Sequence, residues 1–262
     1  MASPEHDARS ISDLLEAACQ PDDSAAWDAI AALHWRGSQE VLSRAIALTR
    51  SGDPKFRGRG ADILSQLGIP ERTFPDECFS AVLPLLADEV EAVIRDAIFA
   101  LHHIDSSQAA SHILPFADHE NSDIRHAVAF GLGAVDTPEA NDALLKLMTD
   151  HDAEVRNWAT FGLGQQSDAD TDQIRMALVL GLADDDPDVR YEAIIGLGRR
   201  RDRQAATYLK TMLHNDPNDI FAREATAKLL GLDESGGMTT AELLGALHRL
   251  QKWNKDSTTH GN

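Results

Sequence analysis

The chain has 262 residues and carries 24 Lys and Arg against 43 Asp and Glu, a net charge of −19 at pH 7 with neutral histidine. Affinity for a polyanion comes mainly from Lys and Arg that neutralise phosphates, so this balance argues against binding to nucleic acid or to an anionic membrane and favours a basic protein partner. A hydrophobic content of 43% excludes wholesale disorder. No apolar run approaches the ~18 residues of a membrane span, and Cys19 and Cys78 lack metal-ligand spacing, so we expect a reduced, cytoplasmic protein.

The first segment, residues 1–21, is predicted to form an N-terminal cap helix. Its apolar residues Ile11, Leu14, Leu15 and Ala18 fall on one face of a helix. A polar outer face is what the first unit of a stacked array needs, because nothing covers it.

From residue 22 to residue 231 the sequence repeats itself. Three segments align without gaps, beginning at Ile124-Arg125, Val155-Arg156 and Val189-Arg190, and each ends in Leu-Gly. Weaker copies place seven anchor positions at residues 26, 57, 94, 125, 156, 190 and 223, which are 31 to 37 residues apart. Such a period is typical of a solenoid built from repeated helical units.

Each copy is preceded by a second apolar stretch with helical period, for example Val41–Leu48 and Ala143–Met148. The pairs Asp53-Pro54 and Asp186-Pro187 have the N-cap and first-turn proline of a helix start. Each unit is therefore predicted to be helix A, a short acidic turn and helix B. The predicted fold is an all-α, right-handed α-solenoid of about seven two-helix repeats.

The C-terminal part is predicted to close the array. Residues 238–254 form a one-sided apolar helix that would cap the last repeat, and residues 255–262 are polar and expected to be a flexible tail. We expect the whole chain, 1–262, to be a single solenoid domain.

The repeated pattern D-x-(D/E)-x-V-R-x-x-A-x-x-x-L-G resembles the bacterial HEAT-like repeats of the phycobilisome-lyase type. In that family the Asp four residues before the Arg, and the Arg itself, form a ladder between adjacent repeats. The resemblance implies a structural ladder of Asp53 with Arg57, Asp152 with Arg156 and Asp186 with Arg190. The pattern departs at Val90 with Ile94, so the third repeat is expected to be held less regularly.

A stripe along helix B is the candidate binding surface. Counted from the anchor, positions +3 and +7 carry core residues, so +1, +5 and +9 should face away from that core. In resembling proteins helix B lines the concave face, and aromatic residues with polar neighbours there are typical of protein-binding hot spots. We call the predicted set the B-helix stripe: Arg95, Phe99, His126, Phe130, Asn157, Phe161, Tyr191, Ile195 and Arg199.

The +5 column of this stripe, Phe99, Phe130, Phe161 and Ile195, has two interpretations. It is either an exposed apolar ridge or ordinary packing between successive B helices. Two tryptophans outside the column are expected to pack: Trp158 at a boundary, and Trp27 against the N-terminal cap.

No catalytic, metal-binding or cofactor-binding residues are predicted. Five histidines lie between His102 and His126, but the single His-Glu pair, His119-Glu120, falls in a turn, whereas HEAT-type deoxyhypusine hydroxylase carries several such pairs on helices. The acidic run 184–188 lacks the Gly and Glu of a calcium loop. The basic cluster Arg199–Arg203 follows a helix B, where cations offset the helix dipole, and therefore does not indicate a DNA-binding face.

These observations predict a non-enzymatic protein that binds a protein partner in the groove of the B helices. A sharper hypothesis is an inhibitor or immunity protein that blocks a basic toxin or nuclease, since an acidic protein is suited to a cationic cleft. The alternatives are an enzyme, either a subunit similar to the bilin lyases or a metal-dependent hydroxylase, and a scaffold without a preferred groove ligand.

Overall fold

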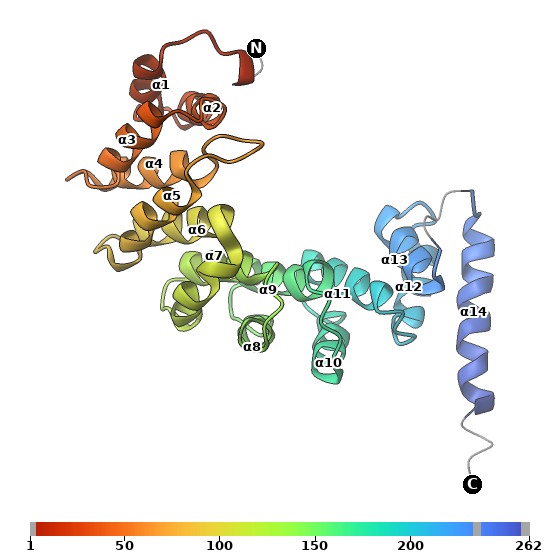
Figure 1. The fold of residues 1–262 in the computed structure, drawn as a ribbon. Helices are drawn as coiled ribbons and strands as arrows, with labels where there is room; N and C mark the ends of the chain where they lie inside the picture. Colours follow the sequence, from red (N-terminus) through yellow and green to blue (C-terminus); the bar gives the residue numbers. More distant parts are fainter. Residues whose placement is uncertain (1–3, 233–236, 258–262) are drawn as a thin grey trace. The chain divides into compact units, whose positions relative to one another are not determined.

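The computed structural model describes residues 4–232 and 237–257, with side chains up to Gln251, and within these ranges it contains 14 α-helices and no strand (Figure 1). The predicted all-α solenoid is confirmed. The chain divides into two compact units, residues 1–132 and residues 133–262, which are described in turn.

The N-terminal unit contains four helix pairs: α1 with α2, α3 with α4, α5 with the first part of α6, and the second part of α6 with α7. The backbone of α6 leaves helical geometry at Asp105, with φ −157° and ψ 99°, where helix B of one repeat meets helix A of the next. Short helical turns complete the unit: η1 (Pro4–His6), η2 (Leu83–Ala87) and η3 (Leu114–Asp118). The bounds are α1 (Ile11–Ala18), α2 (Asp23–His34), α3 (Gln39–Leu48), α4 (Pro54–Ser65), α5 (Pro75–Val82), α6 (Glu91–Ile113) and α7 (Ser122–Leu132).

The helix expected in the segment 1–21 is α1, which pairs with α2 as helix A of the first repeat. Helix α1 packs on α2, and its Leu14 and Ala18 are fully buried. One apolar face on a terminal helix suits both a cap and the first helix of a repeat.

The C-terminal unit contains three more pairs, so the predicted total of seven repeats is confirmed. Helix α14 (Figure 1) then packs on α12 and α13. Its Leu243 and Leu247 are fully buried. Residues 255–257, expected in the tail 255–262, belong to α14, and residues 258–262 lie outside the described residues. The bounds are α8 (Pro138–Leu147), α9 (Ala153–Phe161) with the π-helical turn η4 (Gly162–Gln166), α10 (Asp172–Gly181), α11 (Pro187–Arg199), α12 (Ala205–Asn215), α13 (Ile220–Leu230) and α14 (Thr240–Ser257).

Side-chain caps start the B helices where the sequence predicts. Asp53, Asp152 and Asp186 each accept a hydrogen bond from a backbone N–H in the first turn of the following helix. Helix α6, by contrast, has Val90 at its N-cap position, where an apolar side chain cannot accept a hydrogen bond. The less regular third repeat is thus confirmed at its first turn.

The +3 and +7 positions form the core as predicted. All six in the three clearest repeats are fully buried: Val128, Leu132, Ala159, Leu163, Ala193 and Leu197. Glycines allow the helices of the C-terminal unit to approach closely, because a Cβ added at Gly196 would lie 2.7 Å from the Cα of Gly164. Over the described ranges no helix is both long and apolar enough to cross a membrane.

Candidate functional site

The repeated arginines join successive repeats through bidentate ion pairs. Arg57 donates from Nε and Nη2 to Asp88 at 2.6 and 2.8 Å, and Arg156 donates in the same way to Asp184, at 2.8 Å for both bonds. Each guanidinium holds the pKa of its carboxylate partner below the usual range, chiefly by hydrogen bonding. The ladder between repeats therefore exists and is structural.

The acidic partners in the ladder differ from the predicted ones. Asp53, Asp152 and Asp186 use their carboxylates to cap their own helices, so the arginine reaches an aspartate in the turn before the next helix B. Arg190 donates to the carbonyls of Asp184 and Asp185 at 2.7 and 2.9 Å. The prediction of the pairs was wrong because an N-cap carboxylate is already engaged by backbone N–H groups.

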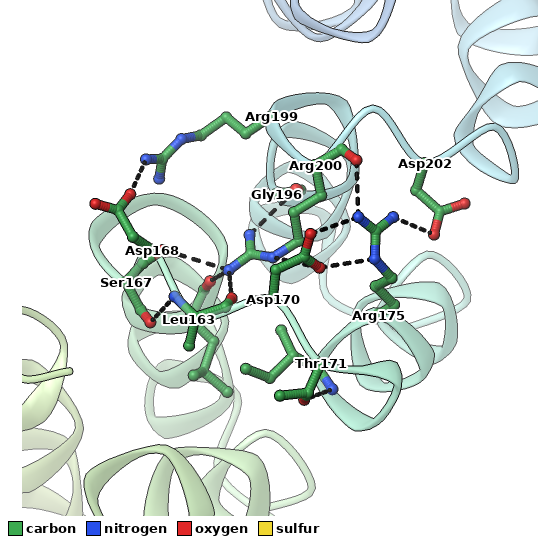
Figure 2. Close-up of polar contacts among 12 residues, drawn as sticks. Leu163, Ser167, Asp168, Asp170, Thr171, Arg175, Gly196, Arg199, Arg200 and Asp202 are labelled. Carbon is green, nitrogen blue, oxygen red and sulfur yellow. Dashed lines mark hydrogen bonds and ion pairs between the residues drawn. The ribbon is translucent and has the colours of Figure 1, made fainter. Parts of the chain in front are cut away.

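The end of the fifth repeat is held by three arginines (Figure 2). Arg200, whose side chain is 6% exposed, donates to the carbonyls of Leu163 at 2.5 Å, Ala169 at 2.7 Å and Gly164 at 3.0 Å. Arg175 binds Asp170 with two bonds of 2.7 and 2.6 Å. Arg200 of the basic cluster therefore stabilises carbonyl groups at a helix end.

Arg199 belongs to this cap, which corrects its assignment to the partner surface. It donates to the carbonyls of Gly164 and Gln165. Its Nη2 also lies 3.4 Å from Oδ1 of Asp168 (Figure 2). Its long alkyl chain places the guanidinium at the carbonyl end of η4. The position of Arg199 on its helix could not predict this, because register gives the helix face but not the reach of the side chain.

Ile195 is also not part of a binding surface. It is 3% exposed and lies directly before Gly196, where α11 approaches η4 closely. Ile195 is therefore part of the core between repeats. The other members of the stripe in the C-terminal unit, Asn157, Phe161 and Tyr191, are half-buried. The ring of Phe161 lies 5.6 Å from that of Trp158, and Tyr191 lies 4.7 Å from Phe221.

In the N-terminal unit the stripe forms an aromatic cluster. The rings of Phe99 and Phe130 are 5.2 Å apart in an edge-to-face arrangement, His126 lies 5.8 Å from Phe99, and His102 lies 4.7 Å from Phe130. Both phenylalanines are half-buried, so here the +5 column both packs between helices and keeps a surface open to solvent.

Beside this cluster a groove of about 460 Å³ crosses α2, α4, α6 and the start of α7. A hollow of about 500 Å³ adjoins it, shares four of its residues and adds Asp23 and Arg59. The groove includes two aromatic rings and three carboxylates against one guanidinium. We call it the acidic groove and define it by Trp27, Asp62, Arg95, Asp96, Phe99 and Asp123.

The electrostatics of the acidic groove are set by burial. Burial raises the pKa of Asp62 to about 7, with a further contribution from the nearby Asp96, while Arg59 opposes the shift. Burial lowers the pKa of His103 to about 4 and also lowers the pKa of His34. These two histidines are therefore uncharged at neutral pH. Asp62 is about half ionised near pH 7, and the three carboxyl groups together still outweigh the single charge of Arg95.

Sequence reasoning missed Trp27, Asp62 and Asp96 as site residues. Trp27, expected to pack on the cap, is 50% exposed, so that prediction was wrong. The signal was present: Trp27 is +1 from the anchor at 26, and Asp62 is +5 from the anchor at 57. Carrying the stripe into the first two repeats would have found both.

Among the described residues no three His, Cys, Asp or Glu side chains are grouped as metal ligands. His119 lies at the end of η3, in a turn as predicted, where its Nδ1 accepts the backbone N–H of Asn121 at 3.1 Å.

The family model for HEAT repeats matches residues 79–164 and 141–231, which together span more than half of the chain. No curated protein matches by sequence.

Solved structures share the fold at low identity. YibA of Escherichia coli is 23% identical with a TM-score of 0.73, covering 93% of each chain. The complex of CpcE and CpcF of phycocyanin lyase from Nostoc sp. PCC7120 is 17% identical with a TM-score of 0.51, covering 95% of this chain and 98% of that one. The HEAT-like repeats protein from Thermococcus onnurineus NA1 is 15% identical with a TM-score of 0.51, covering 94% and 99%. Together with the repeat geometry, the family match shows that this chain belongs to the HEAT-repeat proteins.

Proposed function

We propose that this protein is a non-enzymatic, cytoplasmic interaction module that binds a basic segment of a protein partner in the acidic groove. HEAT repeats suggest a protein-interaction or scaffold role. The observation that carries the proposal is the combination, in one groove, of the exposed Trp27 and half-buried Phe99 with three carboxylates.

Aromatic rings supply contact area at a small entropic cost, because their side chains have few rotatable bonds. Trp27 on α2 and Phe99 on α6 flank α4, whose neighbours on both sides are these two helices. A segment lying across α4 would therefore contact both rings. The well-packed repeats below hold the rings in place before binding, which limits the ordering cost.

Charge favours a basic partner. The whole chain carries −19, and the acidic groove itself has Asp62, Asp96 and Asp123 against Arg95. Complementary charge of this kind accelerates association and disfavours acidic competitors. It supports the sharper hypothesis, inhibition of a basic toxin or nuclease, for which a toxin gene next to the gene for this protein would be further support.

The test is site-specific photo-crosslinking in host lysate. Trp27 is replaced by p-benzoylphenylalanine, and Met176 on α10, which is 66% exposed in the other unit, receives the same substitution as a matched control. Products are identified by mass spectrometry. We expect one dominant basic protein at position 27, competed by unlabelled wild-type protein and absent from the control.

Identical products at both positions, or an acidic product at position 27, would refute the acidic groove as the binding surface. For the inhibitor hypothesis the captured protein is assayed with and without this chain. Undiminished activity of the captured toxin or nuclease at saturating chain refutes inhibition. Incubation with free bilin and elemental analysis test the non-enzymatic part, which a covalent bilin adduct or stoichiometric bound metal would contradict.

A further inference from the structure

We infer that the acidic groove recognises one lysine or arginine side chain of the partner, with its cationic head at Asp62 and Asp96 and its alkyl stem against Trp27 and Phe99. This inference rests on the proposed function and names the chemical group that the groove selects.

The carboxyl groups of Asp62, on α4, and Asp96, on α6, lie at the same face of α4. A Cβ added at Gly58 would lie 2.5 Å from Oδ2 of Asp96, so the Asp96 carboxylate lies against α4 at that position. Asp62 follows Gly58 by four residues, one helical turn, and so lies on the same side of the helix. Both residues line the acidic groove and the adjoining hollow.

The cations already present leave this pair incompletely neutralised. Lys55 lines the hollow, but its Nζ donates to the carbonyl of Gln20 at 2.9 Å. Arg59 makes its short contact with Asp23, at 2.6 Å, and a longer one of 3.3 Å with Asp62. Arg95 lies 2.8 Å from Asp96. Asp62 therefore has only a long contact with a cation, and Asp96 has one short contact. Such a pair of neighbouring carboxyl groups favours binding of a further cation from the partner.

Arg59 is itself evidence that the site is incomplete. It is 8% exposed and lines the hollow beside the groove, yet its buried Nε has no hydrogen-bond partner among the described residues. An unsatisfied buried donor costs free energy. The guanidinium nearest Asp62 is thus imperfectly satisfied where it stands, and its contact with Asp62 is the long one of 3.3 Å.

The aromatic rings suit the stem and head of a basic side chain. The guanidinium carbon of Arg59 lies 5.5 Å from the centre of the Trp27 ring, so this ring already faces one cation. Lys and Arg pack their methylene groups on apolar surface while their charge stays with polar groups. An acidic side chain would meet three carboxylates, and an apolar one would leave the Asp62 and Asp96 pair without a cation.

The experiment is a titration followed by fluorine NMR. The chain has four tryptophans, which are labelled as 5-fluorotryptophan, and the Trp27 signal is assigned from Trp27→Phe. The probes are N-acetyl-arginine amide, N-acetyl-lysine amide and the isosteric but uncharged N-acetyl-norleucine amide, at constant ionic strength. We expect saturable millimolar shifts of the Trp27 signal with the two cationic probes and none with norleucine amide.

Asp96→Asn and Asp62→Asn should each weaken the binding of N-acetyl-arginine amide at least tenfold. Asp28→Asn is the matched control, because Asp28 is an exposed neighbour of Trp27 that does not line the groove, and it should leave binding unchanged. Circular dichroism checks the fold of each variant. If Asp62→Asn does not fold, Asp96→Asn decides the question alone.

A pH series adds a readout that a purely structural role of Asp62 would not move. Binding of the cation favours ionised Asp62, so affinity for arginine amide should rise between pH 6 and pH 8 in the wild type and much less in Asp62→Asn. The groups around Asp62 are Asp23 and His34 from α2, Lys55 and Arg59 from α4, Arg95, Asp96 and His103 from α6, and Asp123 and His126 from α7. Comparison with Asp62→Asn removes the contribution of the others.

Equal shifts with norleucine amide, or unchanged arginine binding in a folded Asp96→Asn variant, would overturn the inference. The two proposals can fail separately. Arginine amide binding without any protein crosslinked at position 27 refutes the proposed function alone. A specific partner at position 27 whose capture survives both Asp→Asn substitutions refutes the cationic pocket alone.

Discussion

Replacing Arg200 with Met should open the end of the fifth repeat. The guanidinium bonds the carbonyls of Leu163 and Ala169 at 2.5 and 2.7 Å and that of Gly164 at 3.0 Å (Figure 2). Methionine keeps much of the alkyl stem, so the substitution removes the donors and leaves most of the apolar packing.

The expected cost follows from the carbonyls left without a partner. Each buried acceptor that loses its donor costs about 1–3 kcal/mol. The Gly164 carbonyl keeps a bond from Arg199 at 3.2 Å, so Leu163 and Ala169 carry most of the loss. Burial lowers the pKa of Arg200, which shows that desolvating the guanidinium already costs free energy and reduces the net effect. We therefore expect a local loss of ~3 kcal/mol.

Hydrogen exchange followed by mass spectrometry measures this locally. Since 1.4 kcal/mol is a factor of ten, peptides covering residues 162–171 should exchange roughly 100-fold faster in Arg200→Met. Peptides from α4 in the other unit should be unchanged. Arg201→Met is the control, because Arg201 is the exposed neighbour in the same cluster. A change below about threefold in Arg200→Met, or an equal change in Arg201→Met, would refute the capping role.

The remaining predictions concern packing and pH. Gly196→Ala places a Cβ 2.7 Å from the facing backbone and should lower the free energy of unfolding, measured in urea, by ~1–3 kcal/mol. The control Gly245→Ala, whose nearest contact is 3.5 Å away, should be neutral or slightly stabilising. Equal losses in the two variants would contradict the close approach at Gly196. Because its pKa is raised to about 7, native Asp62 keeps a proton between about pH 4 and pH 7 that the unfolded chain has released. The free energy of unfolding should therefore fall as pH rises through this window, by up to roughly 4 kcal/mol. Urea titrations of Asp62→Asn should lack this pH-dependent component. An unchanged slope in that variant would show that other groups cause it. Ile195→Ala should lower the free energy of unfolding by ~2–5 kcal/mol, since the side chain is 3% exposed, and Trp27→Ala by about 1 kcal/mol, since that side chain is 50% exposed. Thermal unfolding measures both variants. A larger loss of stability in Trp27→Ala than in Ile195→Ala would contradict the burial of Ile195.

Helix positions could be predicted well because their signals are local. Asp53-Pro54 and Asp186-Pro187 start α4 and α11 where the cap and proline pattern indicates. The fusion of two helices in α6 across Asp105 was not predictable from hydrophobic period, because both flanking segments are helical and differ only in the backbone of one residue.

The candidate site was predicted only in part. The register of the stripe is correct for Phe99 and His126, which line the acidic groove, but Ile195 at the same position of a later repeat is buried. Register gives the face of a helix on which a residue lies. Whether a neighbouring helix covers that face depends on the spacing between helices, which varies from repeat to repeat.

The sequence by itself determined the all-α class, the seven repeats, the helix starts and the core positions, because each depends on a short period or on a cap within a few residues. Only the tertiary structure decided which residues of the stripe stay open, which aspartate each ladder arginine reaches, and that Asp62, Asp96, Trp27 and Phe99 meet in one groove. These features join residues from different helices. Their distances depend on how closely backbones can approach, as at Gly196, and on where long arginine side chains find acceptors, and neither property is periodic along the chain.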